Sequence, residues 1–310
     1  MCCLFGIVNY SGKAYTGADA LVNELAQCAT LRGMDSTGIA YNKNGVLKVY
    51  KKPRNAYEMD FTGLADCAVV TGHTRHATQG SYMKNYNNHP FYGKCSNANF
   101  ALAHNGVLWN DSLLRKSHNI PKDRIETDSY IAVQLLEHFG ALSFENVRKM
   151  AESVSGSFAF SMVDSFDALW LVKGDSPLSI VHFPQLKLYA YASTEQILFT
   201  ALSSTDLVHD IIAGDFEMVD ISCGDIMLID SKGIISVQRF NYYHSYYNCD
   251  WRTYGNTNTN YWETDYERQY LEDLKSVARC MGFDDDDIDG LYRDGYTLDE
   301  IEDFLYGLYS

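Results

Sequence analysis

The chain has 310 residues, a formal net charge of −15 and a hydrophobic content of 46%, which suits a globular protein with a full core. The acidic balance argues against nucleic-acid partners, because binding a phosphate backbone requires clustered Lys and Arg, and against docking on anionic membranes. No apolar run reaches the length of a membrane span and no signal peptide is expected, so we predict a cytoplasmic protein.

The sequence up to residue 240 alternates short runs typical of strands with helical ones. The expected helices cover 17–31, 127–139 and 144–154, where apolar residues recur on one face. The expected strands are rich in β-branched and aromatic residues, and they cover 3–9, 36–42, 46–52, 67–75, 99–105, 157–164, 168–174, 178–183, 186–193 and 226–237. This content predicts an α+β fold of stacked sheets with helices outside.

The composition changes after residue 240. Residues 241–262 are rich in Tyr and Asn and predict a linker or arm; a base-stacking platform would need a cationic groove that only His244 and Arg252 could supply. Residues 263–310 are acidic and predict a small helical appendage. Within it, DDDDIDG has partial calcium-loop spacing, but Tyr296 stands where a bidentate Glu is required, so we expect an acidic turn.

The eight cysteines are scattered apart from Cys2 and Cys3. Their spacing matches neither a zinc site nor a dense disulfide framework, so we expect reduced thiols. The spacing His73-x-x-His76 could be half of a metal site, but no acidic partner lies at helical spacing. We therefore expect neither a metal ion nor another cofactor.

Five short motifs follow one another along the chain. They are MCCLFG at the start, LRGMDSTGIA at 31–40, GHTRHATQG at 72–80, HNGVLWN at 104–110 and ETDSY at 126–130. Taken singly each has an ordinary explanation: HNG could form a hairpin turn, and Arg75 with Asp128 could be a structural ion pair.

In this order and spacing the motifs resemble those of the class II (Ntn-type) glutamine amidotransferases. The likeness is greatest to the glutaminase domain of glucosamine-6-phosphate synthase, and NNHPF at 87–91 is similar to stand-alone members of the family. The resemblance covers 1–240 and implies a four-layer αββα Ntn-hydrolase sandwich. The residues that follow are too few for a synthase domain.

The resemblance implies a catalytic group at the start of the chain. Removal of Met1 would free the α-amine of Cys2, which titrates near neutrality and can take the proton of its own thiol. Attack on a side-chain amide would then give a thioester. The resemblance assigns the oxyanion donors to the Asn105 side chain and the Gly106 backbone N–H.

The resemblance also implies residues that read an amino-acid head group. Arg75 would pair with the α-carboxylate and Asp128 with the α-ammonium, while Thr78 would add a hydroxyl contact. Arg32 belongs to a loop that would fold over the substrate. His76 stands where the synthase pattern has Trp, in a gate over the ammonia path, so tight channelling is in doubt.

Together these motifs predict an enzyme that hydrolyses the side-chain amide of L-glutamine to glutamate and ammonia. The ammonia would pass to a separate acceptor enzyme or be released. Two alternatives remain: an Ntn amidohydrolase acting on another γ-glutamyl amide, and a catalytically silent sensor or scaffold of the same fold.

Overall fold

The computed structural model describes residues 2–242 and, beyond them, 271, 274, 275, 278, 283–293, 296, 298, 301 and 305. The chain divides into two compact units, Met1–Ser245 and Tyr246–Ser310, which are considered separately. Apart from 241 and 242, the expected Tyr- and Asn-rich arm lies outside the described residues.

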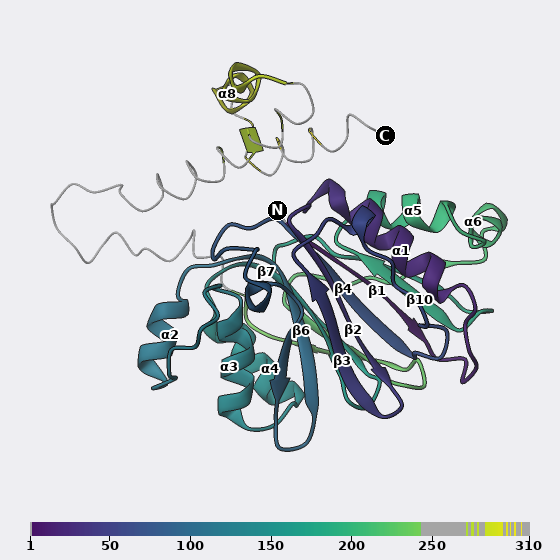
Figure 1. The fold of residues 1–310 in the computed structure, drawn as a ribbon, viewed down its shortest axis with the longest axis horizontal. Helices are drawn as coiled ribbons and strands as arrows, with labels where there is room; N and C mark the ends of the chain where they lie inside the picture. The colour runs from purple at the N-terminus through teal and green to yellow at the C-terminus, as the bar shows by residue number, and fades with distance from the viewer. Residues whose placement is uncertain are drawn as a thin grey trace, which may run out of the picture. The chain divides into compact units, whose positions relative to one another are not determined.

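Two antiparallel sheets form the centre of the first unit (Figure 1). Sheet A has seven strands in the order β11 (Glu217–Met218), β9 (Ser179–Phe183), β10 (Leu188–Ala192), β1 (Cys3–Asn9), β4 (Val69–Arg75), β2 (Ser36–Lys43) and β3 (Val46–Lys52). Sheet B has six strands in the order β13 (Ile235–Arg239), β12 (Asp225–Ile229), β8 (Leu169–Lys173), β7 (Gly156–Asp164), β6 (Asn99–Leu108) and β5 (Phe91–Lys94).

Helices cover the outer face of each sheet. Figure 1 shows α1 (Ala18–Cys28), α5 (Glu195–Ser203) and α6 (Val208–Ala213) on one side of the sheets, and α2 (Asp111–Ser117), α3 (Tyr130–Phe139) and α4 (Phe144–Ser153) on the other. Short 3-10 turns occupy Ala29–Leu31, Ala56–Glu58 and Asn85–Asn87.

Three buried clusters separate the layers. One joins α1 and α5 to sheet A, a second joins α3 and α4 to sheet B, and a third lies between the two sheets. Since both faces of each sheet are covered, the residues of central strands such as β1, β4 and β10 are buried on both sides, which explains their nearly continuous apolar runs. The predicted four-layer αββα sandwich is confirmed.

Strand alternation brings the two key strands together between the sheets. In β1, Phe5 belongs to the helix-side cluster and Leu4 to the cluster between the sheets. Side chains alternate between the two faces of a strand, so Cys2, two residues before Leu4, lies on the same side of sheet A as Leu4. In β6, Ala101 and Ala103 face the same inter-sheet layer, so Asn105 faces sheet A.

Several elements differ from the sequence expectation. The strands β5 and β11 and the helices α2, α5 and α6 were not expected. The single strand expected at 226–237 is a hairpin, because the Asp230 carboxylate accepts hydrogen bonds from the backbone of Lys232 and Ile234 and closes a turn.

In the second unit, the structure gives the full bounds of the helix α8 (Asp285–Arg293). The expected acidic turn is therefore wrong: Asp284 and Asp287 accept hydrogen bonds from each other's backbone N–H at 3.0 Å. Acidic residues at a helix N-terminus also interact favourably with its dipole. Lys275 pairs with Asp289 at 2.8 Å, and apolar side chains are buried at Leu274, Ala278, Ile288, Leu298, Ile301 and Leu305.

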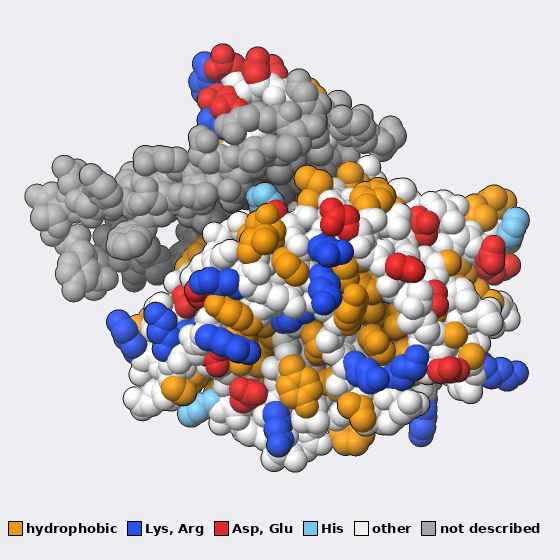
Figure 2. Space-filling view, in the orientation of Figure 1, with side chains coloured by type: hydrophobic (Ala, Val, Ile, Leu, Met, Phe, Trp, Pro, Cys, Tyr) orange, Lys and Arg blue, Asp and Glu red, His pale blue; other side chains and the backbone are white. Residues whose placement is uncertain are grey.

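The surface of the first unit carries mixed charge on the face drawn in Figure 2, where Lys and Arg side chains are spread among acidic, apolar and uncharged ones. Among the described residues, no helix combines the length and the apolar character needed to cross a membrane.

Candidate active site

Cys2 lies directly before β1, the strand in the middle of sheet A. Its thiol faces the carbonyl oxygen of His76 at 3.5 Å, and its own carbonyl accepts a hydrogen bond from Arg32 Nε at 3.1 Å. Burial raises the pKa of the Cys2 thiol, while the nearby Arg75 guanidinium acts in the opposite direction. A free thiol in this position therefore needs a base to become a nucleophile.

Ser193 anchors the strand that carries Cys2, and sequence reasoning missed it. Its backbone N–H donates to the Leu4 carbonyl at 2.9 Å, and its Oγ accepts from the Leu4 N–H at 2.9 Å. Asn105 Nδ2 approaches the same Oγ at 3.4 Å. The one signal in the sequence was a hydroxyl residue closing the apolar run LKLYAYAS.

Asn105 and Gly106 lie inside β6, so the alternative interpretation of HNG as a hairpin turn is wrong. Asn105 is 2% exposed. Gly106 has a φ of +133°, and a Cβ atom there would lie 2.1 Å from the Ser157 carbonyl oxygen on β7. Only glycine fits, because L side chains rarely adopt this conformation and the neighbouring backbone leaves no room.

Arg75, the last residue of β4, holds the loop that follows it. Its Nη1 donates to Asn88 Oδ1 at 2.9 Å, and its Nη2 donates to the carbonyl oxygens of Gln79 and Gly80. No ion pair joins Arg75 to Asp128 among the described residues, so the alternative of a simple structural pair is not what the structure contains. The guanidinium instead holds the loop that follows β4 in place through these three hydrogen bonds.

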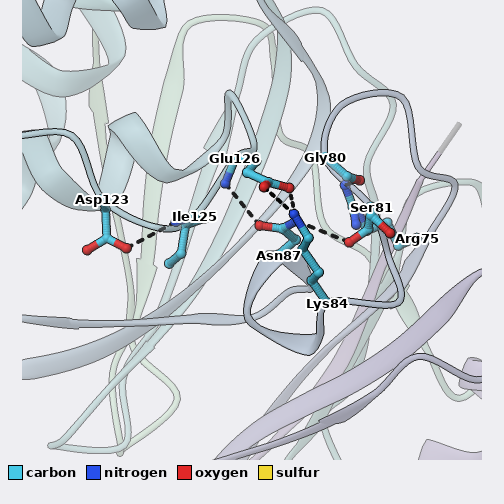
Figure 3. A network of polar contacts seen from close by, with 8 residues as sticks. All are labelled: Arg75, Gly80, Ser81, Lys84, Asn87, Asp123, Ile125 and Glu126. Atoms are coloured by element: carbon cyan, nitrogen blue, oxygen red, sulfur yellow. Dashed lines mark hydrogen bonds and ion pairs between the residues drawn. The ribbon is translucent and has the colours of Figure 1, made fainter.

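A second network ties this loop to the segment before α3 (Figure 3). Asn87 Nδ2 donates to Glu126 Oε2 at 2.9 Å, and the Glu126 N–H donates to Asn87 Oδ1 at 2.9 Å. Lys84 pairs with the other Glu126 oxygen, and Asn87 Nδ2 also donates to the Ser81 carbonyl at 3.1 Å. These bonds fix the backbone that leads into Thr127 and Asp128.

Asp128 is buried against the end of β6. Its Oδ2 accepts from the Leu108 N–H at 2.6 Å, and its Oδ1 accepts from Ser129 Oγ at 3.3 Å. Ser129 Oγ also lies 2.8 Å from His104 Nδ1. The carboxylate is thus oriented by the backbone of β6 and by the side chain of Ser129, the residue directly before α3.

One pocket gathers most of the predicted site residues. It encloses about 250 Å³ including its open mouth. Six of the eight predicted residues border it: Cys2, Arg75, His76, Thr78, Gly106 and Asp128. Of the other two, Arg32 contacts the Cys2 backbone and Asn105 contacts Ser193. Residues that sequence reasoning did not assign also border the pocket: Gln79, His89, His104, Thr127 and Ser129.

Three buried histidines stand beside this pocket. The rings of His73 and His89 have centroids 4.2 Å apart, and His73 Nε2 lies 2.9 Å from the His104 carbonyl oxygen. Burial lowers the pKa of His73 to about 3 and lowers the pKa of His89 and His104 as well. All three are therefore neutral at physiological pH.

Lys51 packs against the same group of residues. Its Nζ donates to the carbonyl oxygens of Asn88 and Pro90 and lies 4.8 Å from the centroid of the Phe91 ring. Burial, together with the nearby Arg75 charge, lowers its pKa to about 7. The histidines thus have cationic neighbours, which adds to the effect of burial in keeping His89 uncharged.

The His73-x-x-His76 spacing does not form a metal site. Within the part of the chain that the structure describes, no group of three or more His, Cys, Asp or Glu side chains could hold a metal ion. His73 is instead packed against His89.

Sequence comparison relates the chain to known enzymes. Over 250 residues, 76% of the chain, it is 30% identical to the glutamine–fructose-6-phosphate aminotransferase (isomerizing) of Staphylococcus aureus. The chain belongs to the class II, Ntn-type glutamine amidotransferase family. The corresponding Listeria monocytogenes enzyme is 34% identical over 185 residues, 56% of the chain. No protein-family model matches the chain.

The amidotransferase assignment agrees with the fold of solved structures. The glutamine phosphoribosylpyrophosphate amidotransferase of B. subtilis superimposes with a TM-score of 0.61 at 20% identity, covering 77% of this chain and 49% of that one. This likeness shows a shared fold. The chain spans 39% of the length of the Staphylococcus relative and 30% of the Listeria one.

Proposed function

We propose that this amidotransferase hydrolyses the side-chain amide of L-glutamine to glutamate and ammonia, with Cys2 as the nucleophile. The observation that carries the proposal is one pocket bordered by a thiol, by Gly106 of the oxyanion strand, and by a cationic and an anionic group at Arg75 and Asp128. A free amino acid carries that same pair of charges, and its side-chain amide is the bond to be broken.

The chemistry starts with removal of Met1, which frees the α-amine of Cys2. That amine takes the thiol proton, and the sulfur attacks the amide carbon. The carbonyl oxygen becomes an oxyanion that accepts hydrogen bonds from the Gly106 N–H and from Asn105. The C–N bond then breaks as the amine returns the proton, which releases ammonia and leaves a thioester. Water attacks the thioester, yields glutamate and restores the thiol.

Head-group binding involves the loop that Arg75 holds. Its Nη2 donates to the carbonyls of Gln79 and Gly80, so we propose that the substrate α-carboxylate replaces these carbonyls as the loop adjusts. Thr78 and His76 border the same pocket and would contact the substrate there. Arg32 would act through the Cys2 backbone that it already contacts.

The domain organisation and the fate of the ammonia belong to the same proposal. We propose residues 1–240 as the glutaminase domain, 241–262 as a linker or arm and 263–310 as a helical appendage. Ammonia would pass to a separate acceptor enzyme in the cytoplasm or be released. The first relatives are named as aminotransferases that use fructose 6-phosphate, and the chain matches less than half of their length.

The test measures ammonia release from L-glutamine and from a panel of γ-glutamyl amides. We expect activity on glutamine that falls to background in Cys2→Ala and persists in the matched variant Cys3→Ala, whose thiol is buried on the other side of β1. Intact mass should show that Met1 is absent. Retained activity in Cys2→Ala refutes the mechanism, and preference for another γ-glutamyl amide reassigns the substrate. A wild-type protein inactive on the whole panel, with Met1 retained, identifies a silent scaffold.

A further inference from the structure

Lys51 is a largely buried lysine whose amine has no carboxylate partner among the described residues. Its Nζ donates to the backbone carbonyl oxygens of Asn88 and Pro90, the latter at 2.9 Å, and lies 4.8 Å from the centroid of the Phe91 ring. The charged group that acts on this amine is another cation, Arg75. Lysines are rarely buried unless they are paired, because removing a charge from water is costly. No step of the proposed reaction uses this amine.

Lys51 and Arg75 hold the same residue from two sides. Lys51 binds the backbone carbonyl of Asn88, and Arg75 Nη1 donates to the Asn88 side-chain oxygen at 2.9 Å. The segment that contains Asn88 is also tied to Lys51 through Asn85, whose Nδ2 donates to the Lys51 carbonyl at 2.9 Å. A change in the position of the Lys51 amine would therefore be passed to Asn88 and from there to the guanidinium of Arg75.

The same segment lies directly against the strand pair that carries Lys51. Gly38 on β2 is opposite Lys51 on β3. A Cβ atom at Gly38 would lie 2.3 Å from the His89 carbonyl oxygen and 2.6 Å from Lys51 Cβ. The backbone at His89 thus packs on sheet A without space for a methyl group, and Lys51 anchors it there through the carbonyl groups on either side of that residue.

The groups around the Lys51 amine keep one charge state near neutral pH. Burial holds His73 and His89 neutral, with the pKa of His73 at about 3 and the pKa of His89 well below its usual range. Arg75 keeps its positive charge, because arginine is not deprotonated in proteins. Lys52, the next residue along β3, points to the opposite face of the strand. Lys51 is the member of this set that changes its charge, since burial and the Arg75 charge lower its pKa to about 7.

A negatively charged ligand at Arg75 would supply the charge that both cations lack. The substrate carboxylate proposed for Arg75 is such a ligand, and a nearby negative charge favours the protonated form of a lysine. The hydrogen bonds of Lys51 are compatible with both states. A neutral amine has two N–H groups for the two carbonyl oxygens, and an ammonium group has three. Proton uptake therefore leaves the anchor intact.

We propose that Lys51 is a positioning residue, which orients Arg75 through Asn88 and takes up a proton from solvent when the substrate carboxylate binds. This inference rests on the proposed function. The bound state then holds more protons than the free enzyme. Affinity is therefore highest below pH 7 and falls, by at most about tenfold per pH unit, as the pH rises above 7. When the product leaves, Lys51 returns the proton to solvent.

Calorimetry with L-glutamate as the ligand counts these protons. The binding enthalpy is measured at pH 7.5 in phosphate and in Tris, whose ionisation enthalpies differ, and the difference gives the number of protons taken up. We expect the wild type to take up roughly half a proton more than Lys51→Met or Lys51→Arg, because neither replacement titrates in this range. The α-amine of Cys2 also titrates near this pH, but it is present in every variant. The difference between wild type and variants therefore belongs to Lys51.

Steady-state kinetics test the positioning role. Lys51→Met keeps an unbranched side chain but donates no hydrogen bond. Its KM for L-glutamine should rise about 3- to 10-fold, the cost of about one hydrogen bond, while kcat stays within about twofold of the wild type. Lys51→Arg keeps the donors and should recover most of that loss. The matched control is Lys52→Met, which removes the neighbouring exposed lysine and should match the wild type in KM and in proton uptake.

Two results would overturn the inference: proton uptake in Lys51→Met equal to that of the wild type, or an unchanged KM in the same variant. The glutaminase proposal fails separately, if the wild type releases no ammonia from L-glutamine. Calorimetry does not depend on turnover. If an inactive wild type still binds L-glutamate, with a proton uptake that Lys51→Met lacks and more tightly than that variant, the role of Lys51 stands. If the wild type does not bind L-glutamate, both proposals fail.

Discussion

The hydroxyl oxygen of Ser193 accepts a hydrogen bond from the backbone N–H of Leu4 at 2.9 Å. The same oxygen lies 3.4 Å from the side-chain nitrogen of Asn105, which belongs to the opposite sheet. Leu4 follows the proposed nucleophile by two residues, and Asn105 is the proposed oxyanion donor. One buried serine therefore links the strand of the attacking group to the strand of the group that stabilises charge.

Replacing this serine should slow the reaction without weakening substrate binding. In Ser193→Ala we expect kcat for glutamine to fall about 10- to 100-fold, because small displacements of reacting groups have effects of that size. KM should change little. The matched control is Ser161→Ala, which removes another buried hydroxyl between the sheets, one that contacts Thr71 Oγ1 at 2.9 Å. Steady-state kinetics that show the same kcat in both variants would contradict this positioning role.

Gly106 should not tolerate any side chain. Gly106→Ala combines a φ of +133° with a Cβ 2.1 Å from the Ser157 carbonyl, so the strand pair β6–β7 must move apart. We expect the free energy of unfolding in urea to fall by about 1–3 kcal/mol, the cost of one strained backbone position, and activity to be lost with it.

The control for this change is Gly12→Ala. Gly12 also has a positive φ, of +70°, but among the described residues no atom beyond its two chain neighbours lies within 4 Å of the position that an alanine methyl group would take there. Its loss of stability should be smaller, and its activity should match the wild type. If both glycine variants lost stability and activity to the same extent, the contact with Ser157 would not be what excludes a side chain at 106.

The buried histidines should make the protein less stable in acid. His73, with a pKa near 3, and His89 and His104, with lowered pKa values, stay neutral in the folded protein, whereas an unfolded chain protonates them near pH 6.5. Below pH 6.5 the unfolded state binds more protons. Between pH 6.5 and its own pKa, His73 then lowers the free energy of unfolding by about 1.4 kcal/mol per pH unit, and His89 and His104 act in the same direction, while above pH 6.5 the three contribute no slope.

Urea unfolding between pH 7.5 and 4.5 tests this, with His73→Gln as the comparison. The glutamine amide can still donate to the His104 carbonyl, which His73 Nε2 contacts at 2.9 Å, but it does not titrate. The variant should show a shallower loss of stability in acid than the wild type. Parallel pH profiles would mean that His73 is protonated in the folded protein.

Much of the fold could be predicted because its signals are local. The strand runs and three of the helices stand out by composition and periodicity, and the helix expected at 144–154 is α4 almost to the residue. The helix expected at 127–139 begins only at Tyr130, because Asp128 turns back to accept the Leu108 N–H. That tertiary contact leaves no trace in the local pattern.

The site residues also fall into two groups: those that a local sequence motif identifies, and those that only the folded structure identifies. Cys2, Arg75, Gly106 and Asp128 carry motif signals and meet at one pocket. Ser193 carries no such signal, because its importance comes from Leu4, which is 189 residues away in the sequence and is reached only when β1 and β10 pair. His89 and Thr127 carry none either, since what marks them is the lack of a partner for their polar side-chain atoms among the described residues.

Cys2 and Cys3 are neighbours in sequence but face different layers of the sandwich. Cys2 borders the pocket, while Cys3 is 0% exposed among the side chains packed between sheet A and its helices. A thiol reagent small enough to enter the pocket should therefore modify one sulfur and spare the other. Joining the two in a disulfide would require unpairing the first residues of a central strand, so a disulfide formed by Cys2 in the folded protein must involve a thiol other than that of Cys3.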